Sequence, residues 1–195
     1  PFYEPGLEEL VRRSVAQRRL RLTASINDVV DHGTIIFLCV GTPSRANGEA
    51  DLTAVEEVSR QIAHAMRSYR LIVEKSTVPV ETGSCIKRMM RRTVRKGVAC
   101  DVASNPEFLR EGQAVQDFLH PDRIVLGVES RQAEQLLREL YKPLSAPVIV
   151  TDVKSAELIK HASNSFLAVK ISFINTIAQL CDRVGADVVK VADGL

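Results

Sequence analysis

Two carboxylates four residues apart are the first feature of the sequence that could carry out chemistry. Glu107 and Glu111 lie in the segment NPEFLREG, residues 105–112. Asn is a frequent helix N-cap and Pro is favoured at the first helical position, so the segment predicts a short helix with both carboxylates on one face. Like charges at this spacing repel mildly, whereas acidic residues are common near a helix N-terminus. A functional and a purely structural interpretation are therefore equally open here.

A lysine and an asparagine one helical turn apart form the second candidate. Lys160 and Asn164 lie in a helical pattern in which, from residue 155 to 177, only Glu157, Lys160 and Lys170 are ionised at neutral pH. A lysine is usually solvated. A helix with so little charge is nevertheless expected to pack on most of its sides, where an ammonium needs a specific partner. This favours a site for Lys160 over an exposed surface.

Alternating strands and helices are expected to position these side chains. Apolar runs bounded by turn residues predict buried strands, and helical periodicity lies between them. This alternation predicts an α/β fold, namely a partial Rossmann-like, doubly wound parallel sheet followed by a long helix. Ser25 and Ser130 are expected to cap helices. The expected strands are residues 20–23, 34–40, 71–73, 99–104, 123–128 and 148–150, and the expected shorter helices are residues 7–15, 26–30, 53–68, 82–90 and 131–141.

Three successive strand ends share an unusual composition. Residues 41–43 (GTP), 76–79 (STVP) and 104–107 (SNPE) each combine hydroxyl or amide side chains with a proline. Ligands of such sheets bind beyond the carboxyl ends of the strands. Proline after a single strand is ordinary in loops, but three such ends on one edge favour a binding cleft.

A long uninterrupted helix is predicted after the sheet. Residues 154–183 keep a helical pattern without Gly or Pro, which corresponds to about 45 Å of helix. A helix of this length exceeds what a sheet domain needs. We therefore expect a sheet domain at residues 1–150 and the start of a helical domain at residues 151–195.

Composition narrows the function classes. The chain of 195 residues is 45% hydrophobic and carries 26 basic and 24 acidic residues, a balance that suggests neither nucleic acid nor membrane as a partner. The basic cluster at residues 87–96 is best interpreted as a solvated helix face, and a phosphate-binding patch is the alternative. Four scattered cysteines (Cys39, Cys85, Cys100, Cys181) have no metal-ligand spacing, so we expect free buried thiols, no metal and a cytoplasmic location.

The chain resembles the UDP-glucose/GDP-mannose dehydrogenase family over essentially its whole length. Each matching stretch is weak evidence alone, but all of them in order form a strong signature. The segment PDRIV, residues 121–125, favours the UDP-glucose branch. The matching stretches are residues 3–10, 40–43, 74–80, 104–112, 117–127 and 157–175.

The resemblance implies an activity and a cofactor. Family members oxidise the C6 hydroxymethyl of a nucleotide sugar to a carboxylate in two hydride transfers to NAD, through a cysteine-bound thiohemiacetal and thioester. The expected reaction is UDP-glucose to UDP-glucuronate, a precursor for polysaccharide biosynthesis, with GDP-mannose or another UDP-sugar as alternatives. The resemblance also makes residues 1–150 an NAD-binding domain and residues 151–195 the start of a central domain, whose long helix would form a homodimer.

The resemblance assigns catalytic roles by position. Lys160 and Asn164 match the positions that stabilise the developing alkoxide, and Glu107 matches the base that hydrolyses the thioester. Thr77 and Glu111 match positions that contact the nicotinamide end and an ordered water. The residues expected to contact the cofactor are Thr42, Thr77 and Glu111, and those expected to line the sugar nucleotide are Glu107, Phe108, Leu109, Arg110, Glu111, Lys160 and Asn164.

Some family features are missing or changed. No G-x-G-x-x-G phosphate loop occurs in the sequence, so we expect it before residue 1, and the catalytic cysteine after Leu195. The chain would then be an internal segment, inactive alone and with a gap in its sheet. Glu81 replaces a usual Gly and Thr176 a usual Glu.

Two other classes remain open. One is a non-catalytic dinucleotide- or sugar-binding relative, which would keep the cleft without the cysteine. The other is a β-hydroxyacid dehydrogenase, which also uses a Lys/Asn pair but performs one oxidation. Members of that family do not usually carry segments like residues 104–112, so the nucleotide-sugar interpretation is preferred.

Overall fold

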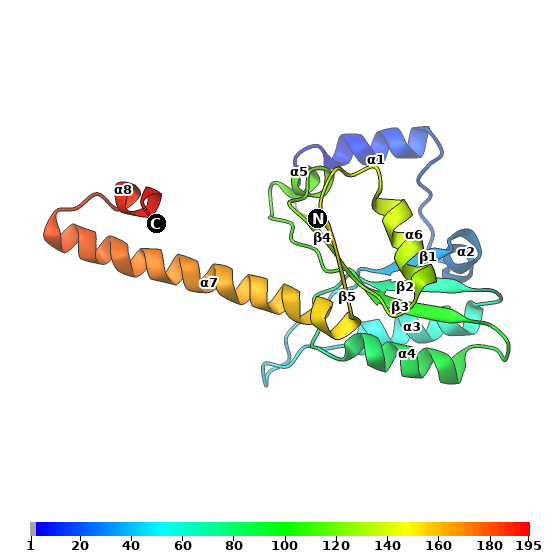
Figure 1. Ribbon diagram of the computed structural model, residues 1–195. Coiled ribbons are helices and arrows are strands. Elements are labelled where there is room, and N and C mark those ends of the chain that lie inside the picture. Colours follow the sequence, from blue (N-terminus) through cyan, green and yellow to red (C-terminus); the bar gives the residue numbers. More distant parts are fainter. Residues whose placement is uncertain (1–2) are drawn as a thin grey trace. The chain divides into compact units, whose positions relative to one another are not determined.

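The computed structural model describes residues 3–195 and divides into two compact units. The first ends at Leu158 and the second runs from Ile159 to Leu195. Figure 1 shows the elements, coloured along the chain. They are α1 (Leu7–Ala16), α2 (Ile26–His32), β1 (Ile35–Leu38), α3 (Thr53–Ala65), β2 (Arg70–Glu74), α4 (Thr82–Thr93), β3 (Cys100–Ser104), α5 (Ala114–Leu119), β4 (Ile124–Gly127), α6 (Arg131–Tyr141), β5 (Val148–Thr151), α7 (Val153–Val184) and α8 (Val188–Asp193).

The first unit is built on one five-stranded sheet in the order β1-β2-β3-β4-β5. β1, β2 and β3 pair in parallel, and so do β4 and β5. β3 and β4 are antiparallel and meet at one residue pair, Ser104 and Gly127. The predicted α/β fold is therefore confirmed, with one antiparallel junction in an otherwise parallel sheet.

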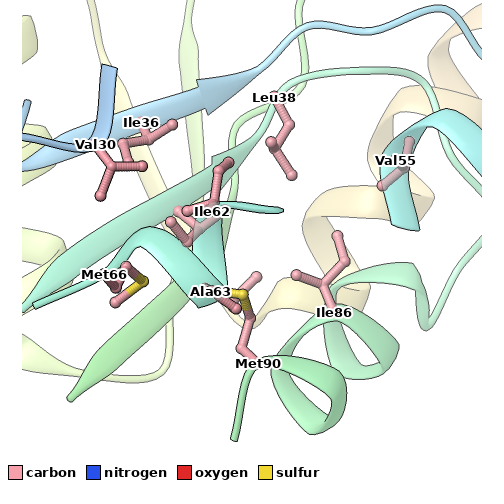
Figure 2. Packing of buried hydrophobic residues seen from close by; sticks show 11 residues of the cluster. Val30, Ile36, Leu38, Val55, Ile62, Ala63, Met66, Ile86 and Met90 are labelled. Carbon is pink, nitrogen blue, oxygen red and sulfur yellow. The ribbon is translucent and has the colours of Figure 1, made fainter. Parts of the chain in front are cut away.

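Helices cover both faces of this sheet (Figure 1). Because side chains alternate along a strand, Ile72 of β2 joins a cluster with α2, α3 and α4, whereas its neighbours Leu71 and Val73 join a second cluster with α6. Figure 2 shows the first cluster, in which Ile62 of α3 and Met90 of α4 lie among fully buried side chains. This two-sided core holds the strand ends in register.

Helix starts are set by local sequence. Ser25 Oγ accepts a hydrogen bond from Asp28 N at 3.2 Å and Ser130 Oγ accepts one from Ala133 N at 3.0 Å. Both predicted N-caps are therefore confirmed. Asp187 caps α8 in the same way, through Val189 N at 2.9 Å.

Two sequence predictions about the sheet are wrong. Residues 20–23 form no strand, because a strand exists only when a neighbour completes its hydrogen bonds and no described strand lies beside this segment. The expected gap is also absent, since the strands of the described chain form one continuous sheet. β1 instead forms one edge of it, and its end is followed directly by the exposed Cys39.

The cysteines are free, as predicted, but their expected burial is only partly right. Cys181 is buried and Cys100 is half-buried, whereas Cys39 and Cys85 are exposed. Cys85 lies on the outward face of α4, one residue before the buried Ile86. Apolar sequence neighbours therefore did not predict burial, because consecutive helical residues point to different sides.

The long helix is confirmed as α7, 32 residues from Val153 to Val184. Within the second unit many of its large apolar side chains are exposed, so the predicted packing on most sides is absent in the single chain. Thr176, which replaces the glutamate usual in the family, donates a hydrogen bond to Ser172 O at 3.0 Å. The helix stays regular at this position. None of the described helices is long and apolar enough to cross a membrane. The exposed apolar residues of this stretch include Phe166, Leu167, Val169, Ile171 and Phe173.

Candidate functional site

The loops after β1 and β2 are joined at the carboxyl edge of the sheet. Thr42 Oγ1 donates a hydrogen bond to Thr77 O at 2.8 Å, and Ser76 Oγ donates one to Val40 O at 2.7 Å. Backbone bonds from Lys75 N and Ser76 N to the end of β1 complete the contact. The structure thus brings together Thr42 and Thr77, two residues 35 positions apart that the family resemblance assigned to the cofactor site.

Asn105 is the buried centre of the next strand end. Its side chain, in a residue only 2% exposed, accepts hydrogen bonds from Lys75 Nζ at 3.1 Å and from the Tyr141 hydroxyl. The amide donates to Val125 O at 2.9 Å, and Asn105 N donates to Glu74 O at 2.8 Å. Burial raises the pKa of Tyr141 to about 12, so its hydroxyl remains a donor. Asn105 therefore ties β2, β4 and α6 together.

The predicted helix over residues 105–112 is wrong. Residues 105–110 have no regular secondary structure, and a turn at 111–113 leads into α5. The Asn105 side chain is occupied by buried partners and cannot cap a helix. The Glu107 carboxylate accepts a hydrogen bond from Leu109 N at 2.6 Å, and this bond closes a local turn. Glu107 and Glu111 consequently lie on a loop, and not on one helical face.

Further contacts hold this loop. Asp117 accepts hydrogen bonds from Arg110 N at 2.9 Å and from its guanidinium Nη2 at 2.7 Å. These bonds lower the pKa of Asp117, with the side-chain bond as the first cause. The Arg123 guanidinium lies 4.2 Å from the centre of the Phe108 ring, a cation–π contact. Phe108 is therefore half-buried, whereas Leu109, Arg110 and Glu111 are exposed.

Three buried glutamates were missed as part of this region by sequence reasoning. Glu4 is 7% exposed, and its carboxylate accepts hydrogen bonds from Gly112 N at 3.0 Å and Ala114 N at 2.7 Å. Glu74 and Glu157 are each 2% exposed. Nothing in the local sequence distinguishes Glu4 or Glu74 from surface glutamates, although Glu157 lies among apolar residues.

Glu74 is the last residue of β2, and the loop that carries Thr77 follows it. Its Oε2 accepts a hydrogen bond from Ser104 Oγ at 3.1 Å, and its buried Oε1 has no hydrogen-bond partner among the described residues. Burial raises the pKa of Glu74 to about 8, opposed by the Ser104 bond and reinforced by the charge of Glu157. The carboxyl is therefore mostly protonated at neutral pH.

Glu157 fastens the first turn of α7 to the start of α4. Its carboxylate accepts hydrogen bonds from Glu81 N and Gly83 N, both at 2.7 Å. Burial raises its pKa, and these two donors oppose the shift. Lys154, one turn earlier, forms an ion pair with Glu81 at 2.7 Å. The segment that follows Thr77 is thus linked to α7 by three contacts.

Lys160 and Asn164 belong to the second unit. Lys160 is 7% exposed, so it does not lie on the solvated face of α7, whereas Asn164 is exposed. The catalytic roles of both residues stay predictions.

The basic cluster at residues 87–96 does not lie at the carboxyl edge of the sheet. Ile86 and Met90 of α4 are buried while Arg91, Arg95 and Lys96 are exposed, as expected for a solvated face. A cavity of about 340 Å³, lined by Arg91 and residues 94–100, lies at the amino end of β3. This is the end opposite Ser104 and the joined loops.

The fold and this edge define a dinucleotide-binding α/β protein, in which ligands occupy the carboxyl ends of the strands. Comparison with known protein families shows which family of such proteins the chain belongs to. The UDP-glucose/GDP-mannose dehydrogenase family, NAD binding domain, matches residues 1–145, and the family's central domain matches residues 154–195. The chain belongs to the UDP-glucose/GDP-mannose dehydrogenase family, and the predicted cofactor of that family, NAD, is confirmed.

Curated relatives match along the whole chain. UDP-glucose 6-dehydrogenase TuaD of Bacillus subtilis (strain 168) is 48% identical over 195 residues, covering 100% of this chain and 42% of that protein. UDP-glucose 6-dehydrogenase of Rhizobium meliloti (strain 1021) is 46% identical over 201 residues, covering 100% and 46%. The chain therefore spans less than half the length of these relatives.

Solved structures agree with the fold. A UDP-glucose dehydrogenase from the hyperthermophilic archaeon Pyrobaculum islandicum superposes with a TM-score of 0.92 and 42% identity, covering 98% of this chain and 45% of that one. A GDP-mannose dehydrogenase from Pseudomonas aeruginosa, solved as a ternary complex, gives a TM-score of 0.94 and 37% identity, covering 99% and 46%.

The loop after β1 is open beside its glycine. A Cβ atom built on Gly41 meets no atom within 4 Å, so the backbone after β1 can be approached closely. Thr42 lies beside it and is held by Thr77 O. No G-x-G-x-x-G phosphate loop occurs in this sequence.

Proposed function

We propose that the full-length protein is an NAD-dependent UDP-glucose 6-dehydrogenase that converts UDP-glucose to UDP-glucuronate. The supporting observation is the similarity to UDP-glucose 6-dehydrogenases, 48% identity over all 195 residues, a match that includes the loops after β1, β2 and β3 and also α7. The product would serve polysaccharide biosynthesis in the cytoplasm. We further propose that residues 1–150 act as the NAD-binding domain and residues 151–195 as the start of the central domain.

Lys160 and Asn164 would act on the sugar alcohol. When hydride leaves C6, negative charge develops on the hydroxyl oxygen as its proton is lost to a base or to water. An ammonium and an amide N–H that donate to this oxygen stabilise the charge most where water is excluded. NAD supplies the hydride acceptor when bound. The burial of Lys160 supports its assignment to this role.

Glu107 would act in the second half of the reaction. A thioester is hydrolysed when a base takes a proton from water as the oxygen attacks the carbonyl carbon. The C–S bond then breaks, which releases the carboxylate product and the cysteine thiolate. The bond from Leu109 N to Glu107 Oε2 holds the carboxylate in one orientation, which suits a base that must meet a water. No cysteine of this chain is assigned to the thioester, and burial raises the pKa of the half-buried Cys100, which disfavours its thiolate.

The remaining proposed roles are contacts with the cofactor and with the sugar nucleotide, most of them made by residues of the loops after the strands. Thr42, Thr77 and Glu111 would contact the cofactor, with Thr77 and Glu111 near the nicotinamide end. The half-buried Phe108 ring, stacked under Arg123, gives the sugar-nucleotide loop a rigid centre. The residues that would line the sugar nucleotide are Glu107, Phe108, Leu109, Arg110, Glu111, Lys160 and Asn164.

We also propose a homodimer formed through α7. Exposed apolar side chains that would be costly in water gather on the helix between Phe166 and Phe173, and burial of such a surface drives association. Sedimentation of the full-length protein tests this directly, because a stable monomer at micromolar concentration contradicts the dimer.

The decisive experiment counts NADH per molecule of sugar consumed by the full-length protein. Two NADH per UDP-glucose support the proposal, one indicates a simple alcohol oxidation, and none indicates a binding protein. The second candidate substrate is GDP-mannose, favoured by the TM-score of 0.94 with a GDP-mannose dehydrogenase. A higher kcat/KM for GDP-mannose than for UDP-glucose would select that alternative.

A further inference from the structure

Glu4 is an exception in the N-terminal segment. The residue is buried, 7% exposed, although α1, which begins three residues later, has no buried residue. Its neighbours Tyr3, Pro5 and Gly6 are exposed, in contrast to Glu4. Because a carboxylate is rarely buried without specific partners, Glu4 is held by its contacts and not by apolar packing around it.

Those contacts lie at the far end of the Glu107 loop. Glu4 Oε2 accepts from Gly112 N at 3.0 Å, and Oε1 accepts from Ala114 N at 2.7 Å. Gly112 has φ +79°, so the chain turns sharply at the first of these donors. The N-cap residue of α5, Gln113, makes no side-chain capping bond. Glu4 therefore supplies that bond from a segment more than 100 residues away.

The loop is consequently anchored at both ends by buried polar side chains. Asn105 holds its beginning through Lys75, Tyr141 and the β4 backbone, and Glu4 holds its end. Between them, Leu109, Arg110 and Glu111 are exposed. These anchored ends act together with the Arg110–Asp117 and Phe108–Arg123 contacts to fix the path of the loop, because each residue left free would gain backbone entropy of about 1–2 kcal/mol.

We propose that Glu4 is a positioning residue for the sugar-nucleotide loop, residues 107–111. By binding both N–H groups, its carboxylate sets the path of the chain and so the places of Glu107 and Glu111. The inference rests on the proposed function of this loop. If Glu4 instead only attached the segment before α1 to the start of α5, its loss would change stability but leave substrate binding and turnover unchanged.

The test compares Glu4→Gln and Glu4→Ala in the full-length protein. Alanine removes both acceptors, whereas glutamine keeps one carbonyl oxygen. Glu8→Ala is the matched control, because Glu8 is exposed on α1 and pairs with the exposed Arg12 of the same helix. Hydrogen exchange at Gly112 and Ala114 measures the contact itself, with the core amide of Ile72 as an internal reference for folding.

We expect Gly112 and Ala114 to exchange about tenfold faster or more in Glu4→Ala, as for the loss of one strong hydrogen bond, with a smaller change in Glu4→Gln. With UDP-glucose and NAD, KM should rise and kcat should fall, and kcat/KM should decrease about 10- to 100-fold. Glu8→Ala should match the unmodified protein in every measurement.

Two results would overturn the positioning role. One is unchanged exchange at Gly112 and Ala114 in Glu4→Ala. The other is faster exchange with unchanged KM and kcat in both variants, while Ile72 exchanges normally. An unmodified protein that oxidises no nucleotide sugar would overturn the proposed function instead, and the exchange measurement separates the two failures because it needs no substrate.

Discussion

Glu81 Oε1 lies 2.7 Å from Lys154 Nζ, and the same Glu81 has a left-handed backbone with φ +81°. This conformation places a side chain against the following carbonyl and is adopted routinely only by glycine. The family resemblance places glycine at this position. The ion pair with α7 is exposed, and exposed pairs contribute little, so it does not offset the backbone strain.

Glu81→Gly is expected to stabilise the full-length protein and raise its Tm by about 1 to 2 °C, because the left-handed conformation is then unstrained. Calorimetry measures the change. Glu57→Gly is the control, since Glu57 is exposed in the middle of α3 and glycine there should lower Tm. A lower Tm for Glu81→Gly would mean that the Lys154 pair outweighs the strain.

Glu74→Gln is expected to remove a pH dependence of stability. The carboxyl ionises near 4.5 when unfolded and at about 8 when folded. Between these values the folded state holds more protons than the unfolded state, so stability falls as pH rises, by at most about 1.4 kcal/mol per pH unit. Below the unfolded pKa and above the folded pKa this group adds no slope.

Urea unfolding from about pH 5 to about pH 8 measures this effect. The variant should gain stability relative to the unmodified protein as the pH increases. Glu57→Gln, an exposed change, should give a curve parallel to the unmodified one. Parallel curves for Glu74→Gln as well would show that Glu74 ionises normally in the folded protein.

Gly127→Ala is expected to destabilise the contact between β4 and α7. A Cβ atom built on Gly127 lies 2.5 Å from Ala156 Cβ and 3.0 Å from Asp152 O. The backbone must therefore shift, which costs about 1–3 kcal/mol. Chemical denaturation measures the loss. Gly41→Ala is the control, because its added Cβ meets no atom within 4 Å, and equal losses in both variants would contradict the steric explanation.

Lys160→Ala is expected to lower kcat of the full-length enzyme about 10²- to 10³-fold, since it removes a donor to the developing alkoxide. Steady-state kinetics with UDP-glucose and NAD measure the loss. Lys170→Ala is the matched control, because Lys170 is exposed on the same helix. A Lys160→Ala enzyme as active as the Lys170→Ala enzyme would exclude the alkoxide role.

The sequence predicted most elements because their signals are local. The apolar run before Gly41 became β1, the serine at residue 130 caps α6, and a stretch without Gly or Pro became α7. The same local logic failed at residues 105–112. There the capping signal of Asn105 was real, but Lys75, Tyr141 and Val125 compete for the same side chain and prevent the helix.

The amino-acid order by itself determined the type of fold, since periodicity, caps and turn residues act over a few neighbours. Its matching stretches also carried the resemblance to the family. Only the tertiary structure decided where the buried carboxylates go. Glu4 reaches Gly112 N and Glu157 reaches Gly83 N across long stretches of chain. Hydrogen bonds of this kind form only after packing has brought distant backbone segments together and removed the water that would otherwise satisfy them.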